Sequence, residues 1–214
     1  GAVLLGICEP QMTGIGGDCF ILFSPSGSNE IMSMNGSGSA PSLANANDLR
    51  DRNLSSIPLD SPHAVTIPCA IDAFCKLSED WGTLGLNTIL QPAIHYATHG
   101  VPIAERVAYD IAQITENLNS VGKEFYLPWG RAPKVGEFFA HPGQVKVLKE
   151  IAKYGRDGFY SGEVAEDMVN SLQKLGGVHS MDDFSSMEAF YTDPISSNFS
   201  KFELVEHPPN GQGA

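Results

Sequence analysis

The sequence predicts a mixed α/β fold of the α+β kind, organised as a single domain over residues 1–214. Short apolar runs bounded by turn residues occur near both ends of the chain and indicate strands. The middle of the chain instead repeats its apolar residues at spacings of three and four, which is typical of amphipathic helices. With 42% hydrophobic and 18% charged residues, the composition is that of a folded globular chain.

The front of the chain combines a glycine turn with a β-hairpin. Residues 14–17 read Gly-Ile-Gly-Gly, and glycines serve where a chain turns or lies against another backbone. The apolar residues 19–23 then predict a strand, residues 24–29 a hairpin loop, and residues 30–34 the partner strand.

A stretch rich in Ser, Asn, Gly and Pro, residues 35–67, is expected to be loop, with one short helix near 46–53. The pattern becomes helical from Pro68, whose missing N–H is tolerated in the first turn of a helix. Apolar residues at helical spacing predict that this helix continues to about Asp80.

Two helices are predicted next, at 87–99 and 104–118, because each segment gathers its apolar residues on one face. Gly100 and Pro102 stand between the two segments and interrupt the helical pattern. We expect the pair to form a helical hairpin.

The remaining third of the chain contains two more helices and two strands. Amphipathic spacing predicts the helices at 142–154 and 162–175. Apolar residues predict the strands at 189–192 and 202–205, on either side of a polar turn at 196–198.

The charge of the chain argues against nucleic acid as a partner. The formal net charge is -12 and the acidic residues are scattered through the sequence, so phosphate backbones and anionic membranes are repelled. The longest apolar stretch, residues 2–8, is far shorter than the roughly 20 residues of a membrane span, so no span is expected in this chain. No basic residues precede this stretch, so it does not read as a signal peptide.

The four cysteines form neither a CxxC pair nor a zinc pattern, and they are expected to be buried thiols. That pattern slightly favours a reducing, cytoplasmic compartment over the periplasm. The chain begins at Gly1 rather than at methionine, so upstream sequence is expected to be missing, and the compartment stays open.

No complete active site can be assembled from motifs in this chain. The glycines of residues 14–17 precede a strand instead of following one, and they lack the third spaced glycine of a dinucleotide-binding fingerprint. His95 and His99 have helical i,i+4 spacing but no catalytic glutamate between them, so an ordinary helix face is favoured over a zinc site. No catalytic residue, metal site or cofactor is therefore predicted.

Several short motifs, each weak alone, follow one another in a family's order over nearly the whole chain. They are Glu9-Pro10 with Gly14-Ile15-Gly16-Gly17 and Phe20, Ala40-Pro41, Val65-Thr66-Ile67-Pro68, Gln91-Pro92-Ala93-Ile94 with Ala97, Gly100 and Pro102, Phe159-Tyr160 with Gly162 and Ala165, Gly176-Gly177, and Pro208-Pro209-Asn210-Gly211-Gln212-Gly213. In this order they resemble the large subunit of gamma-glutamyltranspeptidases.

The resemblance implies an incomplete αββα four-layer sandwich of the N-terminal-nucleophile hydrolase type, shared between two subunits cut from one precursor. It places the nucleophile, an N-terminal threonine of the small subunit, beyond the Pro208-Pro209 segment, with its α-amine as general base. This chain would then be most of the large subunit, lacking the start of an N-terminal helix and everything from the nucleophile onward. It should be inactive alone, and its partners would be the small-subunit segment and a small-molecule amide substrate.

The resemblance also marks a substrate loop. Typical members carry an Arg-Glu-Thr-Ala-Pro motif whose arginine grips the α-carboxylate of the gamma-glutamyl group, whereas here Ser37 takes the arginine's place. The candidate substrate-binding residues are Asn35, Gly36, Ser37 and Gly38. A serine cannot make the bidentate contact, and each charged hydrogen bond lost should weaken binding by about 1.5–3 kcal/mol.

These observations lead to one functional expectation and two alternatives. The chain is expected to belong to a gamma-glutamyltranspeptidase-like hydrolase or acyltransferase, which acts on amide bonds through a threonine outside this chain. One alternative is an amidohydrolase of small amides such as oxamate, from the same family. The other is a homologue without catalytic activity.

Overall fold

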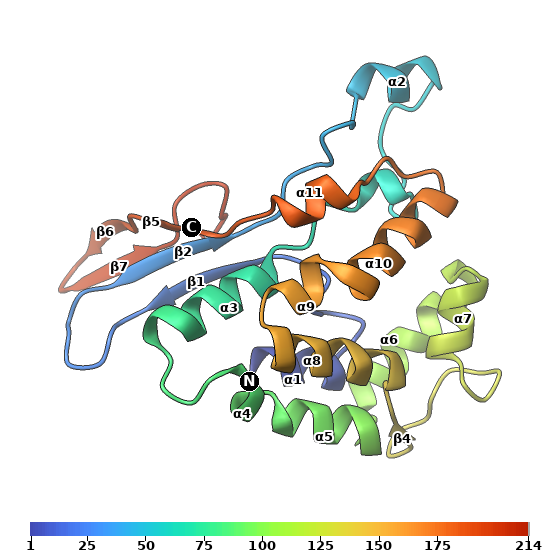
Figure 1. Cartoon of the computed structure of the whole chain (residues 1–214), viewed down its shortest axis with the longest axis horizontal. Helices are drawn as coiled ribbons and strands as arrows, with labels where there is room; N and C mark the ends of the chain where they lie inside the picture. The colour runs from blue at the N-terminus through green and yellow to red at the C-terminus, as the bar shows by residue number, and fades with distance from the viewer. Residues whose placement is uncertain (214) are drawn as a thin grey trace. The chain divides into compact units, whose positions relative to one another are not determined.

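The computed structural model describes residues 1–213, which divide into two compact units, each built from two segments of the chain (Figure 1). The helical unit consists of residues 1–15 and 86–158, and the sheet unit of residues 16–85 with the C-terminal part from Phe159. The chain therefore passes from one unit to the other three times. Single-domain organisation stays a prediction, because units interleaved in this way can belong to one domain or to two.

The sheet unit is built on a three-stranded antiparallel sheet in the order β1-β2-β5. Its strands are β1 (Cys19–Phe23), β2 (Met32–Gly36) and β5 (Phe190–Thr192). Helix α3 (Ala70–Trp81) packs against this sheet, and Figure 1 shows it running alongside β1 and β2. The core between them contains buried Met34, Cys69, Ala73 and Ala189.

The rest of the sheet unit consists of further helices and a second hairpin. They are α2 (Ala46–Asp51), η1 (Pro62–Ala64), α10 (Gly162–Lys174), α11 (Met181–Ser185), β6 (Ile195–Phe199) and β7 (Phe202–Glu206), with α9 (Asp157–Tyr160) where the chain enters the unit. Side-chain caps start three of these helices: Asn45 accepts from the backbone N–H of Asn47, Ser61 accepts from that of His63, and Ser180 and Asp183 form a capping box. The sequence therefore fixes these helix starts locally.

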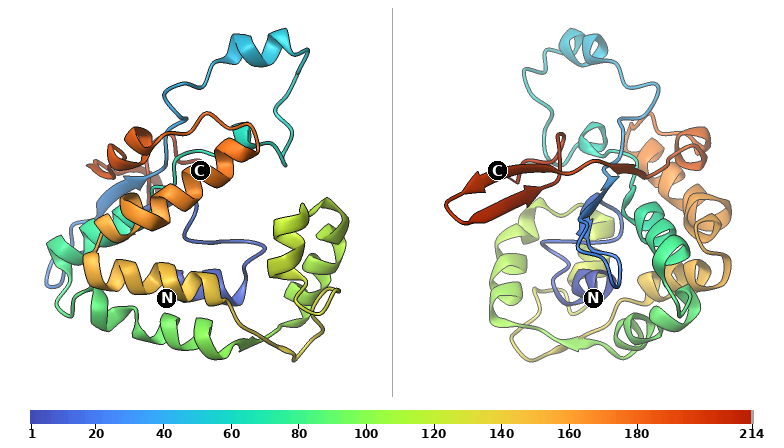
Figure 2. Two further views of the ribbon diagram at one scale, coloured as in Figure 1. Left: turned by 45° about the vertical axis from the view of Figure 1, so that its right-hand side comes forward. Right: turned by 90° about the vertical axis from the view of Figure 1, so that its left-hand side faces the viewer.

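In the helical unit, one face of α5 packs against other helices. Its elements are α1 (Ala2–Cys8), α4 (Leu86–Ile89), α5 (Gln91–His99), β3 (Val101–Pro102), α6 (Glu105–Ile114), η2 (Thr115–Asn117), α7 (Ser120–Tyr126), β4 (Phe138–Phe139) and α8 (Pro142–Tyr154). α5 packs against α8 and α1, and Figure 2 shows α5 (green) and α8 (gold) side by side. A separate apolar cluster joins Ile103, Val107 and Ile111 to Phe139.

Most predicted elements are confirmed, including the first hairpin and the helices that begin near Ala46, Glu105, Pro142 and Gly162. Among residues 1–213, none of the helices has the length and apolar character that crossing a bilayer requires. Cys69 and Cys75 are buried, as predicted, whereas Cys8 and Cys19 are only partly buried.

The prediction of a single continuous helix over residues 87–99 is wrong. The chain instead forms two helices, α4 and α5, that meet at Leu90. Pro92 lies in the first turn of α5, where it needs no hydrogen-bond partner. In one continuous helix it would lack the N–H that should donate to Thr88 and would clash with that carbonyl, so the helix restarts.

The predicted helical hairpin is also wrong, because α5 packs mainly against α8 and α1. Gly100 ends α5 with a φ of 85° and leads the chain into β3, which pairs with β4. An alanine at Gly100 would place its Cβ 3.1 Å from the backbone carbon of Phe139. The glycine therefore provides both the turn and the close approach of the two strands.

Two further boundaries differ from the prediction. Pro68 precedes the N-cap Cys69 instead of lying in the first turn of α3. The polar residues at 196–198 form the middle of β6 rather than a turn, and the chain reverses at Ser200, which has a φ of 57°. Both strands of this hairpin are largely exposed, so they carry no buried apolar face that would have marked β6 in the sequence.

Candidate functional site

The candidate substrate loop starts inside the sheet. Asn35 and Gly36 are the last residues of β2, and they pair with Phe20 and Cys19 of β1. The partner strand begins at Met32, two residues later than predicted, so the assignment of Asn35 and Gly36 to a loop is wrong. Ser37 and Gly38 follow the strand and are half-buried. The rigid sheet therefore positions the first half of the candidate site.

Both glycines of the segment are required by close packing. A Cβ on Gly36 would lie 2.7 Å from the Cβ of Ala73 and 2.8 Å from the Sγ of Cys19. A Cβ on Gly38 would lie 1.7 Å from the carbonyl oxygen of Ile67. The backbone on either side of Ser37 is thus pressed against neighbouring segments, which fixes the position of the serine.

Three residues form a closed ring of hydrogen bonds at the end of β2. The backbone N–H of Ser37 donates to Asn35 Oδ1 at 2.9 Å, and Asn35 Nδ2 donates to Asn210 Oδ1 at 2.9 Å. Asn210 Nδ2 completes the ring by donating to Ser37 Oγ at 2.9 Å. The Pro208-Pro209-Asn210-Gly211 segment is thereby joined to the candidate substrate loop.

Asp18 closes the network from the glycine turn. Its Oδ1 accepts from the backbone N–H of Gly38 at 2.8 Å, and its Oδ2 accepts from Ser37 Oγ at 3.2 Å. We call these five residues, Asp18, Asn35, Ser37, Gly38 and Asn210, the Asp18 network. Its one ionisable side chain is the Asp18 carboxylate, which lies beside Ser37.

His207 holds the C-terminal segment over one face of the sheet. The strand register places Phe20, Asn35 and Phe190 in one row, so their side chains share a face. The rings of His207 and Phe20 have centroids 4.6 Å apart, and the buried His207 pairs through Nδ1 with the carbonyl of Pro208 at 2.7 Å. This packing explains why Asn35 is only 5% exposed.

Sequence reasoning selected Asn35, Ser37 and Gly38 but missed Asp18 and Asn210. Asp18 directly follows the glycine turn at residues 14–17, and Asn210 lies within the motif Pro208-Pro209-Asn210-Gly211-Gln212-Gly213. A polar residue following each glycine or proline run was the available signal. Which of these residues meet could not be read from the sequence, since 175 positions separate Asn35 from Asn210.

The Asp18 network is suited to recognition rather than to bond breaking. Its hydroxyl donates to a carboxylate, with no imidazole or amine within the network to serve as base. Within the described part of the chain, no group of three or more His, Cys, Asp or Glu side chains could hold a metal ion. His95 and His99 stack with ring centroids 4.3 Å apart, and His99 Nδ1 pairs with the His95 carbonyl within α5.

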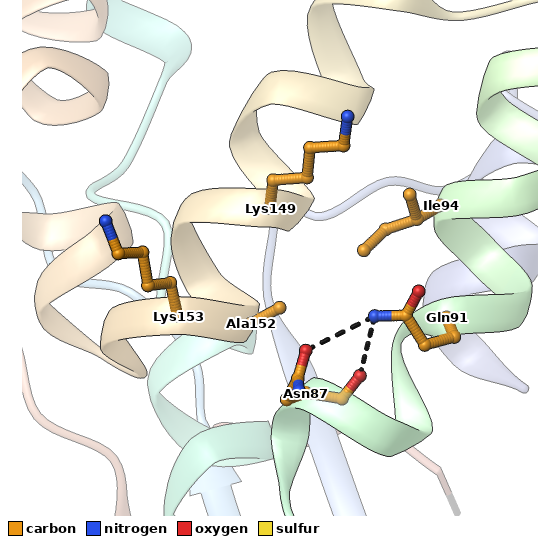
Figure 3. Close-up of a pocket in the computed structure, with 6 residues that line it drawn as sticks. All are labelled: Asn87, Gln91, Ile94, Lys149, Ala152 and Lys153. Carbon is orange, nitrogen blue, oxygen red and sulfur yellow. Dashed lines mark hydrogen bonds between the residues drawn. The ribbon is translucent and has the colours of Figure 1, made fainter.

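A hollow of about 420 Å³ in the helical unit is a second place where a ligand could be sought. It is lined by Asn87, Gln91, Ile94, Lys149, Ala152 and Lys153 (Figure 3). Gln91 Nε2 is engaged by the carbonyl oxygen and Oδ1 of Asn87, at 2.9 Å and 3.3 Å. The hollow thus offers two surface lysines and an occupied amide, which define no substrate class.

Cys19 lies beside the network, and the pKa of its thiol depends in part on the charge of Asp18. Burial, with the neighbouring Asp18 carboxylate as the second cause, raises the pKa of the Cys19 thiol from 9.0 to about 11. The thiolate is the reactive form, so Cys19 should be alkylated at pH 8 at least ~10-fold more slowly than an unperturbed thiol. Its labelling rate should rise only as the pH approaches 11.

Iodoacetamide labelling across a pH series, followed by peptide mass spectrometry, checks this prediction. In the Asp18→Asn variant the labelling midpoint should move to lower pH, because one cause of the raised pKa is removed. A midpoint near 9 in the unmodified protein would contradict the prediction.

The fold is shared with a solved structure. The cephalosporin acylase from Bacillus halodurans superposes with a TM-score of 0.93 and 31% identity, over 99% of this chain and 41% of that chain. The predicted mixed α/β fold class is confirmed by this match together with the helices and strands described above.

Sequence comparison then gives the family. The sequence model described as Gamma-glutamyltranspeptidase matches residues 1–214, so the chain belongs to the gamma-glutamyltranspeptidase family, a family of enzymes. The glutathione hydrolase-like YwrD proenzyme of Bacillus subtilis is 32% identical over 98% of this chain and 40% of its own length. The oxamate amidohydrolase proenzyme of Klebsiella pneumoniae is 28% identical over 99% of this chain and 41% of its own length. The chain therefore spans about two fifths of the relatives it matches.

Proposed function

We propose that this chain is the large-subunit portion of an amide-bond hydrolase or acyltransferase that favours small amides over gamma-glutamyl compounds. The observation that carries the proposal is the Asp18 network, in which a carboxylate lies beside the Ser37 hydroxyl. The resemblance to the family would place an arginine at Ser37. The relatives support the reaction class, since their names include a glutathione hydrolase-like protein, an oxamate amidohydrolase and a cephalosporin acylase.

The chemistry would be that of an N-terminal threonine in the remaining part of the precursor. Its free α-amine takes the hydroxyl proton, the oxygen attacks the amide carbonyl, and the amine product leaves. Water or a second amine then accepts the acyl group from the enzyme. In this scheme Asn35, Gly36, Ser37 and Gly38 hold the acyl group, with Asp18 and Asn210 fixing their geometry.

The partner in this proposal is the rest of the same precursor. The relatives are named as proenzymes and extend well beyond the region matched here. Phe20 and Leu22 on β1 and Phe190 on β5 are 42%, 40% and 54% exposed. Covering them with another segment would remove apolar surface from water, which is favourable at about 25 cal/mol per Å².

The test uses the full-length gene product. We expect it to cleave itself into two subunits and to release ammonia from small amides such as oxamate. Turnover of a gamma-glutamyl anilide, with or without a dipeptide acceptor, should be at least ~10-fold lower in kcat/KM, because a charge-assisted contact is missing.

Each alternative gives a different result. Acceptor-stimulated turnover of the gamma-glutamyl anilide would identify a true transpeptidase. A serine at position 37 would then not lower the activity toward gamma-glutamyl compounds. A protein that is never cleaved and turns over no amide would instead be a homologue without catalytic activity.

A further inference from the structure

The hydrogen-bonding capacity left over at Asp18 is that of an acceptor. The Ser37 hydroxyl and the backbone N–H groups of Ser37 and Gly38 all donate within the network. The two Asp18 oxygens each accept one of these bonds, and a carboxylate oxygen can accept a second. A ligand group that reaches Ser37 therefore meets free acceptor positions on Asp18.

The charge of the network points in the same direction. Asp18 is exposed, so its carboxylate can be reached, and no cationic side chain takes part in the hydrogen bonds of the network. A ligand carboxylate placed here would meet a like charge, whereas an ammonium or amide N–H would meet a complementary one. The raised pKa of the adjacent Cys19 thiol has the Asp18 charge as its second cause, so this charge acts on its surroundings.

We propose that Asp18 is a specificity-determining residue that selects acyl groups carrying a hydrogen-bond donor, in particular an ammonium group, at the end that reaches Ser37. Acyl groups that end in a carboxylate at this position are disfavoured. The inference rests on the proposed function, since it takes this loop as the acyl-binding loop, and it names the substrate class of that site.

The experiment compares three anilides on the full-length, self-cleaved protein. The 4-aminobutyryl, pentanoyl and glutaryl groups have the same chain of three methylenes and end in an ammonium, a methyl and a carboxylate. We expect kcat/KM to fall in that order, with the aminobutyryl anilide at least ~5-fold above the glutaryl anilide, which suits one interaction with an exposed carboxylate. Added salt should reduce this ratio in the unaltered protein, because it screens exposed charges.

Two aspartate variants assign the preference to a residue. Asp18→Asn keeps the size of the side chain and removes its charge, so it should bring the aminobutyryl-to-glutaryl ratio close to one. Asp167→Asn is the matched control, because Asp167 is exposed on α10 and its substitution makes the same change in net charge. The control should keep the ratio of the unaltered protein.

The outcomes separate this inference from the proposed function. A glutaryl anilide turned over as fast as the aminobutyryl anilide overturns the inference, as does an unchanged ratio in a cleaved Asp18→Asn protein. If Asp18→Asn does not fold or cleave, the inference is decided by whether added salt reduces the aminobutyryl-to-glutaryl ratio in the unaltered protein. If none of the anilides is turned over, the dissociation constants of the three anilides for the cleaved protein decide the inference by the same order, and ammonia release from small amides decides the proposed function separately.

Discussion

The Gly38→Ala variant should lose about 3 kcal/mol or more of unfolding free energy. A Cβ at this position would lie 1.7 Å from the Ile67 carbonyl oxygen, a separation that real atoms cannot adopt. The Ile67 N–H also donates to the Ser39 carbonyl at 2.9 Å, so the two segments cannot simply separate without breaking this bond. Overpacking of a tight contact typically costs about 1–3 kcal/mol, and a contact between two backbones has little freedom to relax.

Chemical denaturation of Gly38→Ala beside Gly16→Ala measures this effect. Gly16 stands in the glycine turn that leads to Asp18, and no atom lies within 4 Å of the position its Cβ would take. The control substitution should therefore change stability by less than about 1 kcal/mol. Equal stability of the two variants would show that the approach of Gly38 to Ile67 is looser than the structure has it.

The Tyr160→Phe variant is expected to lose about 2–4 kcal/mol. Tyr160 is fully buried, and its hydroxyl donates to the Pro68 carbonyl at 2.7 Å while accepting from the Asp72 N–H at 3.1 Å. Phenylalanine would fill nearly the same volume but leave both backbone groups without this partner. Each buried polar group left unsatisfied costs about 1–3 kcal/mol.

The matched control is Tyr109→Phe, which removes the same hydroxyl from a side chain that is 61% exposed. Its free energy of unfolding should stay within about 0.5 kcal/mol of the unaltered protein. A Tyr160→Phe protein as stable as this control would mean that water or a small backbone shift replaces the lost hydroxyl.

The Tyr160 hydroxyl also shows how distant motifs depend on one another. Tyr160 belongs to the Phe159-Tyr160 motif, and Pro68 ends the motif that precedes α3. Asp72, on the same helix, accepts from the backbone N–H of Ala189 at 2.7 Å, next to β5. The start of α3 is therefore tied to two later segments of the chain, and α3 in turn packs against the strand that leads to Ser37.

Local patterns in the sequence determined the mixed fold, most of its helices and the first hairpin. Periodic burial and caps act over a few residues, so α8 and α10 could be predicted almost to the residue, from Pro142 and from Gly162. The ordered series of short motifs likewise indicated the family. The errors fell where a single residue redirects the chain, as Pro92 and Gly100 do, and where an exposed strand such as β6 lacks a buried face.

Only the tertiary structure decided which polar residues meet at Ser37. The hydrogen bonds that join Asn210 with Asn35 and with Ser37 span 175 and 173 positions, and the contacts of Asp18 with Ser37 and Gly38 span 19 and 20. Propensity and periodicity describe a residue and its near neighbours, whereas such contacts depend on the path of the whole chain. The sequence by itself led to the prediction that Ser37 takes the place of the family's arginine, and the fold showed that a carboxylate lies beside that serine.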